Sequence, residues 1–369
     1  MSDVYQRLAK KLDELPNGFP ATESGVELKI LRKIFTPEEA EMTLKMRPIP
    51  ETAEAIAERL GKPVNEMEAI LDNMVKKGQI GSASIKGQQV YILFPFIFGI
   101  FEFQLKRVDR EFAELMKEYG PTIMGTVGGY APAVMRIVPI NLEVQARHQV
   151  QPYEDLRQMF EKAKSFQVME CICKKEQALL GKPCTYPTEV CLAFANNEGA
   201  FERYPSGRII SRDEALHIIK TADDVGLVHA TFNAKSNQMF VCNCCSCCCG
   251  MLVGVKRFNV PYLMAKSNFV SIIDQETCAA CGVCTDERCP MEAITQQEDQ
   301  YVVQPDRCIG CGVCVPTCPT ESISLIRKPE SLQVEPPQHL MDWYFKRAEN
   351  LGIRIMIEQA HLSMRGDGP

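Results

Sequence analysis

The feature that most constrains this chain is a cysteine pattern that occurs twice between Cys278 and Ile326. The first copy reads CAACGVCTDERCP and the second reads CIGCGVCVPTCP. In each copy, three cysteines stand two residues apart, and a fourth cysteine is followed by proline. A cubane iron–sulfur cluster needs four thiolates around one small object, and this spacing supplies them. A zinc ribbon or a disulfide knot explains neither the third cysteine of each run nor the prolines. The pattern therefore predicts two clusters.

With eight cysteines in register, residues 271–326 resemble the bacterial-type ferredoxins that carry two [4Fe-4S] clusters. In such proteins the fourth cysteine of each run ligates the cluster of the other run. The resemblance thus implies one ligand set made of Cys278, Cys281, Cys284 and Cys318, and another made of Cys308, Cys311, Cys314 and Cys289. The glycines between these cysteines are expected to let the backbone wrap closely around the clusters.

The first copy departs from the family pattern at one point. Four residues separate Cys284 from Cys289, where the usual gap is three. We expect the extra residue to lengthen a loop without removing a ligand.

Composition sets broader limits on the chain. A length of 369 residues favours two or three domains, and an apolar fraction of 46% is ordinary for a globular protein. A net charge of −6 argues against nucleic acid as the main partner. The N-terminal segment MSDVYQRLAKKLDEL is charged and amphipathic, unlike a signal peptide. We therefore expect a cytoplasmic protein whose 18 cysteines are committed to metal.

The most apolar stretch runs from Val90 to Phe101 and contains Pro95 and Gly99. Twelve residues are too few to span a bilayer, so no membrane span is expected. The stretch is typical of a buried strand followed by a turn. The alternative is a patch that docks on a membrane surface or a partner.

Residues 1–120 are predicted to form a small helical domain with a hairpin. Helices are expected over Val26–Phe35, from Thr36 onward, and over Pro50–Leu60 and Val64–Lys77, with Thr36 and Glu39 forming a capping box. Strands are expected over Gln79–Ile85 and Gln88–Leu93. This order resembles a winged-helix domain.

In that family the helix over residues 65–77 would be the recognition helix. Its polar positions are largely acidic here, including Glu66, Glu68 and Asp72. Because carboxylates repel phosphates, the sequence favours a protein-docking role over DNA binding. A charged amphipathic helix is expected to follow over Glu102–Tyr119.

Residues 121–270 form a second predicted unit. Gly120-Pro121 indicates a boundary, and the glycine-rich residues Gly125–Gly129 indicate a loop, because a dinucleotide fingerprint would need a flanking strand and helix. A strand is expected over Met135–Ile140 and a helix over Pro152–Ser165.

A group of cysteines follows that helix with the spacing C-x-C-x10-C-x6-C, and consists of Cys171, Cys173, Cys184 and Cys191. Lys174, Lys175 and Lys182 are expected to lower the thiol pKa values and offset the charge of a cluster. The pattern favours a third iron–sulfur cluster. Zinc and structural or redox-active thiols remain the alternatives.

The segment VCNCCSCCCG, residues 241–250, then carries six cysteines in eight positions. Successive residues of an extended chain point to opposite faces, so Cys242 and Cys244 are expected to face one cluster while Cys245 and Cys247 face elsewhere. The candidate metal ligands in this segment are Cys242, Cys244, Cys245 and Cys248. The ten central cysteines suit two cubanes with two left over, or one cubane and a larger cluster, with ligands shared between the two stretches. His229, in an expected strand over Leu227–Thr231, is either a ligand or a hydrogen-bonded core residue.

A central cysteine-rich unit followed by a dicluster unit looks like iron–sulfur proteins of anaerobes. The spacing does not match the duplicated CCG domain of heterodisulfide-reductase-type subunits, so a non-cubane cluster is not carried over from that family. The expected architecture is an α+β multi-domain protein, divided into residues 1–120, 121–270, 271–328 and 329–369. The last part is a linker and a helix over Leu340–Leu351, whose Trp343 packs on the body or docks to a partner.

Three functions fit these features. The first is an electron-transfer protein or subunit that passes low-potential electrons through its clusters to or from a partner oxidoreductase or flavoprotein subunit. The second is an iron–sulfur oxidoreductase with an active site at the central cysteines, although no catalytic residue can be named. The third is a cluster-dependent redox sensor that binds DNA, which the acidic helix disfavours.

Overall fold

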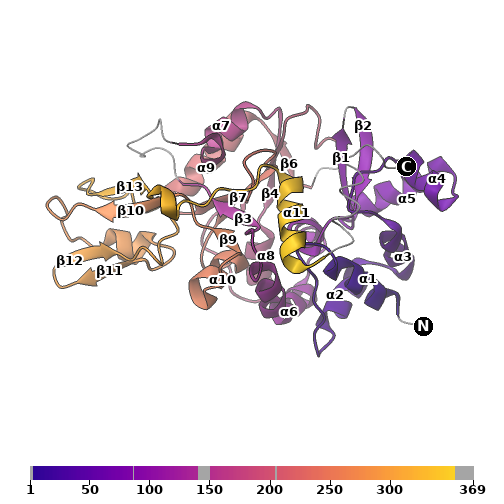
Figure 1. Ribbon diagram of the computed structural model, residues 1–369, viewed down its shortest axis with the longest axis horizontal. Coiled ribbons are helices and arrows are strands. Elements are labelled where there is room, and N and C mark those ends of the chain that lie inside the picture. Colours follow the sequence, from indigo (N-terminus) through magenta and orange to yellow (C-terminus); the bar gives the residue numbers. More distant parts are fainter. Residues whose placement is uncertain (1–2, 86, 140–149, 204–205, 354–369) are drawn as a thin grey trace.

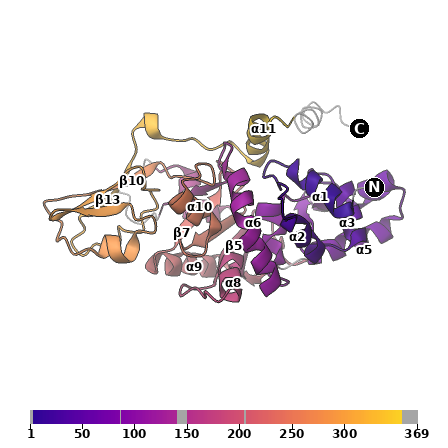
Figure 2. The same ribbon diagram turned by 90° about the horizontal axis from the view of Figure 1, so that it is seen from below.

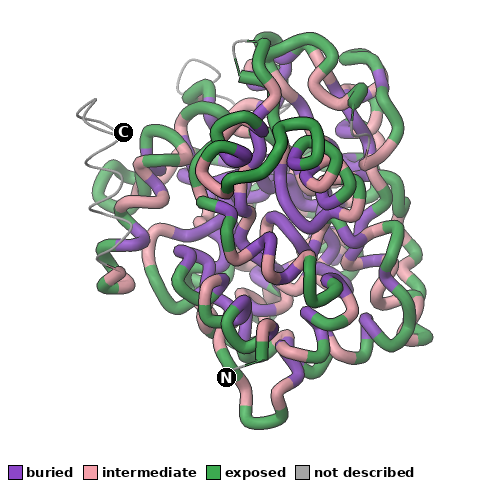
Figure 3. Tube along the Cα trace, turned by 90° about the vertical axis from the view of Figure 1, so that its right-hand side faces the viewer, coloured by how far each residue is buried: buried purple, intermediate pink, exposed green. Residues whose placement is uncertain are grey.

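The computed structural model describes residues 3–85, 87–139, 150–203 and 206–353. Three parts follow one another along the longest axis of the molecule (Figure 1). The N-terminal domain (residues 3–109) lies at one end, the central unit (residues 110–268) in the middle, and the ferredoxin-like module (residues 269–327) at the other end. Buried backbone runs through the interior of the molecule while exposed turns surround it (Figure 3).

The N-terminal domain has five α-helices and a hairpin. These are α1 (Val4–Asp13), α2 (Val26–Ile34), α3 (Pro37–Lys45), α4 (Ala53–Leu60), α5 (Val64–Lys76), β1 (Gly81–Ile85) and β2 (Gln88–Ile92). The helices from α2 on and the antiparallel hairpin occur in the predicted order, close to the predicted bounds. Thr36 caps α3 in the expected capping box with Glu39.

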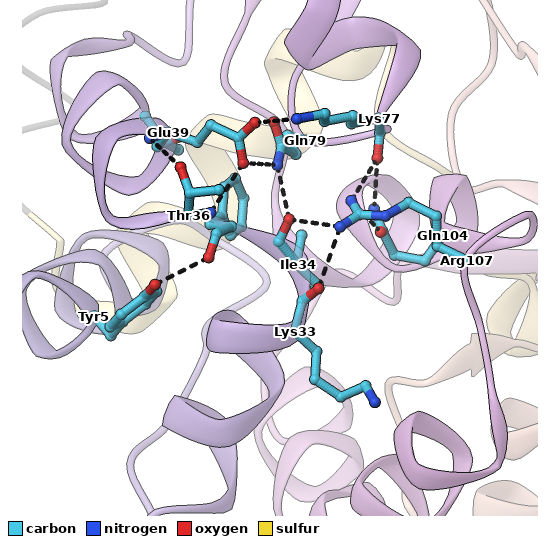
Figure 4. A network of polar contacts seen from close by, with 11 residues as sticks. Tyr5, Lys33, Ile34, Thr36, Glu39, Lys77, Gln79, Gln104 and Arg107 are labelled. Carbon is cyan, nitrogen blue, oxygen red and sulfur yellow. Dashed lines mark hydrogen bonds and ion pairs between the residues drawn. The ribbon is translucent and has the colours of Figure 1, made fainter.

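A polar network joins the turn before α3 to the turn after α5 (Figure 4). The buried Gln79 amide donates to Ile34 O at 2.7 Å and to Glu39 Oε2 at 2.6 Å. Lys77 Nζ lies 2.5 Å from the second Glu39 oxygen. Buried donors and acceptors must be paired to avoid a desolvation cost, so this network fixes how the helices meet the hairpin.

The apolar stretch over residues 90–101 forms the end of β2 and a tight turn labelled η1 (Phe96–Ile100), and η2 (Glu102–Gln104) follows it. Most of its side chains are buried, as expected for a strand followed by a turn. Phe98 has a φ of 59° and stacks on Phe240 of the central unit, with ring centroids 5.8 Å apart. The turn therefore packs the N-terminal domain against the central unit.

The helix α6 (Arg110–Gly128) corrects two expectations. It begins eight residues later than the predicted helix at Glu102, and it continues through Gly120-Pro121 and through the glycine-rich stretch predicted as a loop. Gly128 explains the second error. A Cβ there would lie 2.2 Å from Val260 Cγ1, so this glycine permits close packing.

The central unit is built on a seven-stranded sheet in the order β6-β4-β5-β8-β7-β3-β9. Its strands are β3 (Met135–Ile137), β4 (Ser165–Glu170), β5 (Glu189–Ala195), β6 (Arg208–Ile210), β7 (Val228–Phe232), β8 (Phe240–Cys244) and β9 (Met264–Ala265). All neighbouring strands are antiparallel except β3 and β9. β3 is the start of the strand predicted from Met135, and residue 140 lies outside the described residues.

Further helices accompany the sheet, namely η5 (Pro152–Glu154), α7 (Leu156–Glu161), α8 (Ile172–Leu179), α9 (Arg212–Asp224) and α10 (Gly250–Phe258). The helix predicted over Pro152–Ser165 is shorter than expected. Asp155 caps α7 through the amides of Arg157 and Gln158, and the chain enters β4 at Ser165.

The ferredoxin-like module consists of two antiparallel strand pairs. One pairs β10 (Phe269–Ile273) with β13 (Ile323–Arg327), and the other pairs β11 (Ile294–Gln297) with β12 (Gln300–Val303). A tight turn labelled η6 (Cys284–Arg288) lies between the pairs, and η7 (Glu330–Leu332) follows β13.

The final described helix, α11 (Leu340–Leu351), has the predicted bounds and packs back onto the body (Figure 2). Trp343 is only 1% exposed and donates from Nε1 to Ala133 O at 2.8 Å. Arg347 is also buried and donates to Pro16 O at 2.6 Å. The helix thus ties the C-terminal segment to the first two parts of the chain. None of the helices in the described ranges combines the length and apolarity needed to cross a membrane.

Candidate metal centres

Two cavities in the ferredoxin-like module are each lined by four cysteines. The first is lined by Cys278, Cys281, Cys284 and Cys318. The second is lined by Cys289, Cys308, Cys311 and Cys314. The empty space is about 320 Å³ in the first and about 310 Å³ in the second, including parts open to solvent. In each, one run provides three cysteines and the other provides the fourth, which is the grouping predicted from the sequence.

The walls of these cavities suit thiolate-bound clusters. The remaining side chains that line the second cavity are nearly all apolar, among them Met291, Val303 and Ile309. Four thiols facing one small apolar space form the donor set that a cubane requires. The Ala293 amide donates to Cys289 Sγ at 3.2 Å, and such N–H···S contacts help to set the potential of a cluster.

The two cavities differ in their exposure. Around the first, Cys281 is exposed and Cys278 is half-buried, whereas the three cysteines of the second run, Cys308, Cys311 and Cys314, are buried. Burial raises the pKa of the Cys314 thiol to about 12. At Cys318, burial acts in the same direction, but hydrogen bonds from Thr320 and nearby amides keep the pKa below its ordinary value. The first cavity is therefore the one nearer to solvent.

The longer gap between Cys284 and Cys289 contains a residue that contacts the central unit. Its four residues lie in η6, and Cys289 still lines the second cavity. The last of them, Arg288, donates to Asp223 O and Asp224 O, both at 3.0 Å, and to Val313 O at 3.2 Å. Because Asp223 and Asp224 end α9, the Arg288 cation stands at the C-terminus of a helix, where the carbonyls carry partial negative charge. Arg288 thus joins the module to the central unit.

In the central unit, six cysteines form a connected set that we call the six-thiol group. Neighbouring thiols shift one another's pKa values along the series Cys173, Cys171, Cys191, Cys242, Cys244 and Cys249. The adjacent antiparallel strands β5 and β8 carry three of these residues. Cys171 and Cys249 are the N-cap residues of α8 and α10, so two helix N-termini begin at this group.

The protonation of the six-thiol group is uneven. Hydrogen bonds from Cys173 and Cys191 hold the pKa of Cys171 well below its ordinary value. Hydrogen bonds from Cys191 and Cys244 lower the pKa of Cys242 to about 6. Because metals bind thiolates rather than thiols, a metal that binds this group would displace protons from its thiols.

The other four central cysteines form a second set, which we call the four-thiol group. It consists of Cys184, Cys245, Cys247 and Cys248, whose Sγ atoms all lie within 4.8 Å of one another. Cys184 comes from the loop between α8 and β5, and the others come from the turn between β8 and α10.

This division differs from the grouping by sequence spacing. The spacing joined Cys184 to Cys171, Cys173 and Cys191, but the loop after α8 takes Cys184 to the four-thiol group. Cys242 and Cys244 lie apart from Cys245 and Cys247, as strand alternation indicated. Cys247 and Cys249 were not among the predicted ligands. With these two residues, the six-thiol group and the four-thiol group together contain all ten central cysteines.

His229 lies in neither thiol group. It is 1% exposed on β7, and its Nδ1 lies 2.6 Å from Asn243 Oδ1 while Nε2 contacts Asp223. Asn243 in turn donates to Val190 O at 2.6 Å. His229 is thus a hydrogen-bonded core residue. It links β7 to β8 through Asn243, which stands between Cys242 and Cys244.

The lysines near Cys171 are partly engaged elsewhere. Lys174 is buried and donates to Pro187 O at 2.5 Å, and Lys175 donates to Leu105 O at 2.7 Å. Lys182 is exposed. Of the three, Lys174 contributes to lowering the pKa of Cys171, after the larger effect of the neighbouring thiols.

Two carboxyl groups near the six-thiol group were not predicted from the sequence. Burial raises the pKa of Glu176, on α8, to about 8, with further contributions from Glu102 and Cys171. Burial also raises the pKa of Glu102 to about 7, although the Gly99 amide donates to this side chain at 2.8 Å. No pattern in the sequence distinguishes these glutamates from the other acidic residues.

The acidic face of α5 makes a contact within the molecule. Arg203 of the central unit lies 3.0 Å from Glu68 Oε1 and 2.9 Å from Asp72 Oδ2. Part of the surface that would meet DNA in a winged-helix domain therefore faces another part of the same chain.

Comparison with known proteins identifies the ferredoxin-like module. Residues 301–324 match the Fer4 family, described as a 4Fe-4S binding domain. A ferredoxin of Rickettsia felis is 39% identical over 64 residues, which is 17% of this chain and 54% of that protein. A ferredoxin of Alicyclobacillus acidocaldarius subsp. acidocaldarius is 49% identical over 37 residues, or 10% of this chain and 47% of that protein.

A third relative, from Proteus vulgaris, is named as a probable iron–sulfur subunit of the Frd operon and is 37% identical over 57 residues. That match covers 14% of this chain and 36% of the relative. The chain spans about half the length, or less, of these curated relatives. No solved structure matches the chain. The chain thus contains a ferredoxin-type 4Fe-4S segment, which supports a function in electron transfer.

Proposed function

We propose that this protein passes single low-potential electrons through two [4Fe-4S] clusters in the ferredoxin-like module and a third cluster at the six-thiol group. The observation that carries the proposal is the pair of four-cysteine cavities together with a third set of thiols, of which three are buried and three are half-buried. One set of ligands would be Cys278, Cys281, Cys284 and Cys318. The other would be Cys308, Cys311, Cys314 and Cys289.

The exposure of the cysteines supports an order for the three proposed clusters along the electron-transfer path. The first cavity has the exposed Cys281, so its cluster would exchange electrons with a partner. Cys308, Cys311 and Cys314 of the second cavity are buried, and the last two flank Val313, which accepts a hydrogen bond from Arg288. Since Arg288 also contacts the end of α9, the second cluster would stand between the first cluster and the central unit.

The partner in this proposal is an oxidoreductase or a flavoprotein subunit. One relative is named as the iron–sulfur subunit of an operon, which favours assembly with other subunits. The N-terminal domain, proposed to be of the winged-helix type, would serve as a protein-docking part. The Arg203 contact and the acidic residues of α5 make a DNA surface there less favourable.

A second candidate is an oxidoreductase whose own active site lies at the six-thiol group. Six thiols exceed the four that a cubane uses, and burial raises the pKa values of Glu102 and Glu176, so that these carboxyl groups would be available as proton donors. Turnover of a substrate by the isolated protein with a low-potential donor would favour this candidate over a carrier.

The full chain, prepared without oxygen, provides the test of the electron-transfer proposal. Three cubanes require about twelve irons and about twelve acid-labile sulfides per chain. Electron paramagnetic resonance of the reduced protein should show interacting clusters, and mixing with an oxidised flavoprotein should reoxidise them in single-electron steps. About eight irons would contradict the third cluster, and clusters that exchange no electrons with external acceptors would contradict the function.

A further inference from the structure

The four-thiol group differs in scale from the other cysteine sets of the molecule. Cys184 Sγ lies 3.7 Å from Cys245 Sγ and 3.9 Å from Cys247 Sγ, and Cys247 Sγ lies 3.6 Å from Cys248 Sγ. Among the described residues, this is the set of potential ligands whose donor atoms all lie within 4.8 Å of one another. Within the same described ranges, the cysteines around the two cavities and those of the six-thiol group do not form such a set.

This difference in spacing separates two kinds of metal site. In a tetrahedral site with metal–sulfur bonds of about 2.3 Å, neighbouring sulfurs lie about 3.8 Å apart. In a cubane, each thiolate binds a different iron atom at a corner of the cluster, so the four sulfurs must stand farther apart. The spacing of the four-thiol group therefore suits one ion and is too small for a cluster.

We propose that Cys184, Cys245, Cys247 and Cys248 bind one tetrahedral metal ion, zinc or iron(II), without inorganic sulfide. Binding displaces one proton from each protonated thiol, and the complete site of a divalent ion and four thiolates carries a net charge of −2. Backbone amides help to hold the sulfurs, because the Tyr186 amide donates to Cys184 and the Cys248 amide donates to Cys245. With four protein ligands the site is closed, as structural zinc sites are.

An ion at the four-thiol group would also hold the neighbouring Cys249 of the six-thiol group in place. It would join the loop after α8 to the turn between β8 and α10. Cys248 in that turn is followed directly by Cys249, a member of the six-thiol group. Fixing Cys248 would therefore also fix the approach of Cys249 to the proposed third cluster.

Binding of an ion by the four-thiol group does not require that the protein transfer electrons. The sulfur–sulfur distances stand whether or not the protein exchanges electrons. Metal and sulfide analysis therefore tests the ion site separately from any measurement of electron transfer.

The test begins with metal analysis and X-ray absorption of the full chain, prepared without oxygen. We expect one zinc per chain, or one iron in excess of sulfide, surrounded by four sulfurs at about 2.3 Å. The Cys247→Ser variant should lose that ion and keep the iron and sulfide of the clusters. The matched control Ser246→Ala, in the same turn, should keep both.

Two results would overturn the inference. One is loss of about four irons and about four sulfides from Cys247→Ser, which would indicate a cubane. The other is a wild-type protein with no metal beyond its iron–sulfur clusters, which would indicate free thiols. The absorption measurement needs no variant, so misfolding of Cys247→Ser would not prevent a decision.

Discussion

In the ferredoxin-like module, three cysteines at each cavity come from one run of seven residues, and the fourth comes from the other run. In the central unit, by contrast, each thiol group combines residues more than fifty positions apart, such as Cys184 and Cys245. A local run presents its thiols through the geometry of one loop. The central groups exist only where β5, β8 and the ends of α8 and α10 meet. The two regions should therefore respond differently to the same kind of damage.

The largest expected effect comes from removing one cysteine from each region. Cys281→Ala should lose one cubane, about four irons and about four sulfides, because its cavity keeps only three thiols. The central thiol groups should keep their metal, since none of their ligands changes. Cys242→Ala leaves five thiols in the six-thiol group, so it should change the signal of the third cluster and leave both ferredoxin-type signals unchanged. Iron, sulfide and electron paramagnetic resonance measure both variants. Loss of every cluster in Cys281→Ala would show that the two regions do not fold separately.

A smaller effect is expected at the contact between the regions. Arg288→Met removes the hydrogen bonds to the carbonyls of Asp223, Asp224 and Val313. We expect a loss of about 1–3 kcal/mol in the free energy of unfolding, and slower electron exchange between module and central unit. Denaturant unfolding and stopped-flow reduction measure the two quantities. The control is Arg307→Met, because Arg307 bonds only within the module, to Met291 O and Glu292. Equal electron-exchange rates in the two variants would disprove the role of Arg288.

The last prediction concerns pH. Burial raises the pKa of Glu176 from 4.5 to about 8, so the folded state keeps a proton that the unfolded state releases. The stability associated with this proton is complete below about pH 4.5 and falls as the pH rises towards about 8. Glu176→Gln should therefore be more stable than the wild type at pH 8, with a difference that shrinks towards pH 5.

Denaturant unfolding across this pH range measures the effect of Glu176. Glu198→Gln is the control, since the Glu198 side chain is 81% exposed and should leave the pH profile unchanged. Parallel profiles for Glu176→Gln and the wild type would mean that Glu176 is ionised in the folded protein.

Much of the N-terminal domain could be predicted because its signals are local. The capping box at Thr36 and the apolar spacing of α5 depend on neighbours within one helix, and both elements are present near their predicted bounds. The glycine-rich end of α6 could not be predicted in this way. Gly128 looks like a loop residue in the sequence, yet its role depends on Val260, which is distant along the chain.

By itself, the sequence determined the two ferredoxin-type runs, because a run with two-residue gaps brings its cysteines together without help from the rest of the chain. The match of residues 301–324 to a 4Fe-4S binding domain agrees with that part of the prediction. Only the tertiary structure decided how the ten central cysteines divide. Cys184 and Cys191 are seven positions apart, yet a loop carries one to the four-thiol group while β5 carries the other to the six-thiol group. Strand pairing, which depends on contacts distant in sequence, makes that choice.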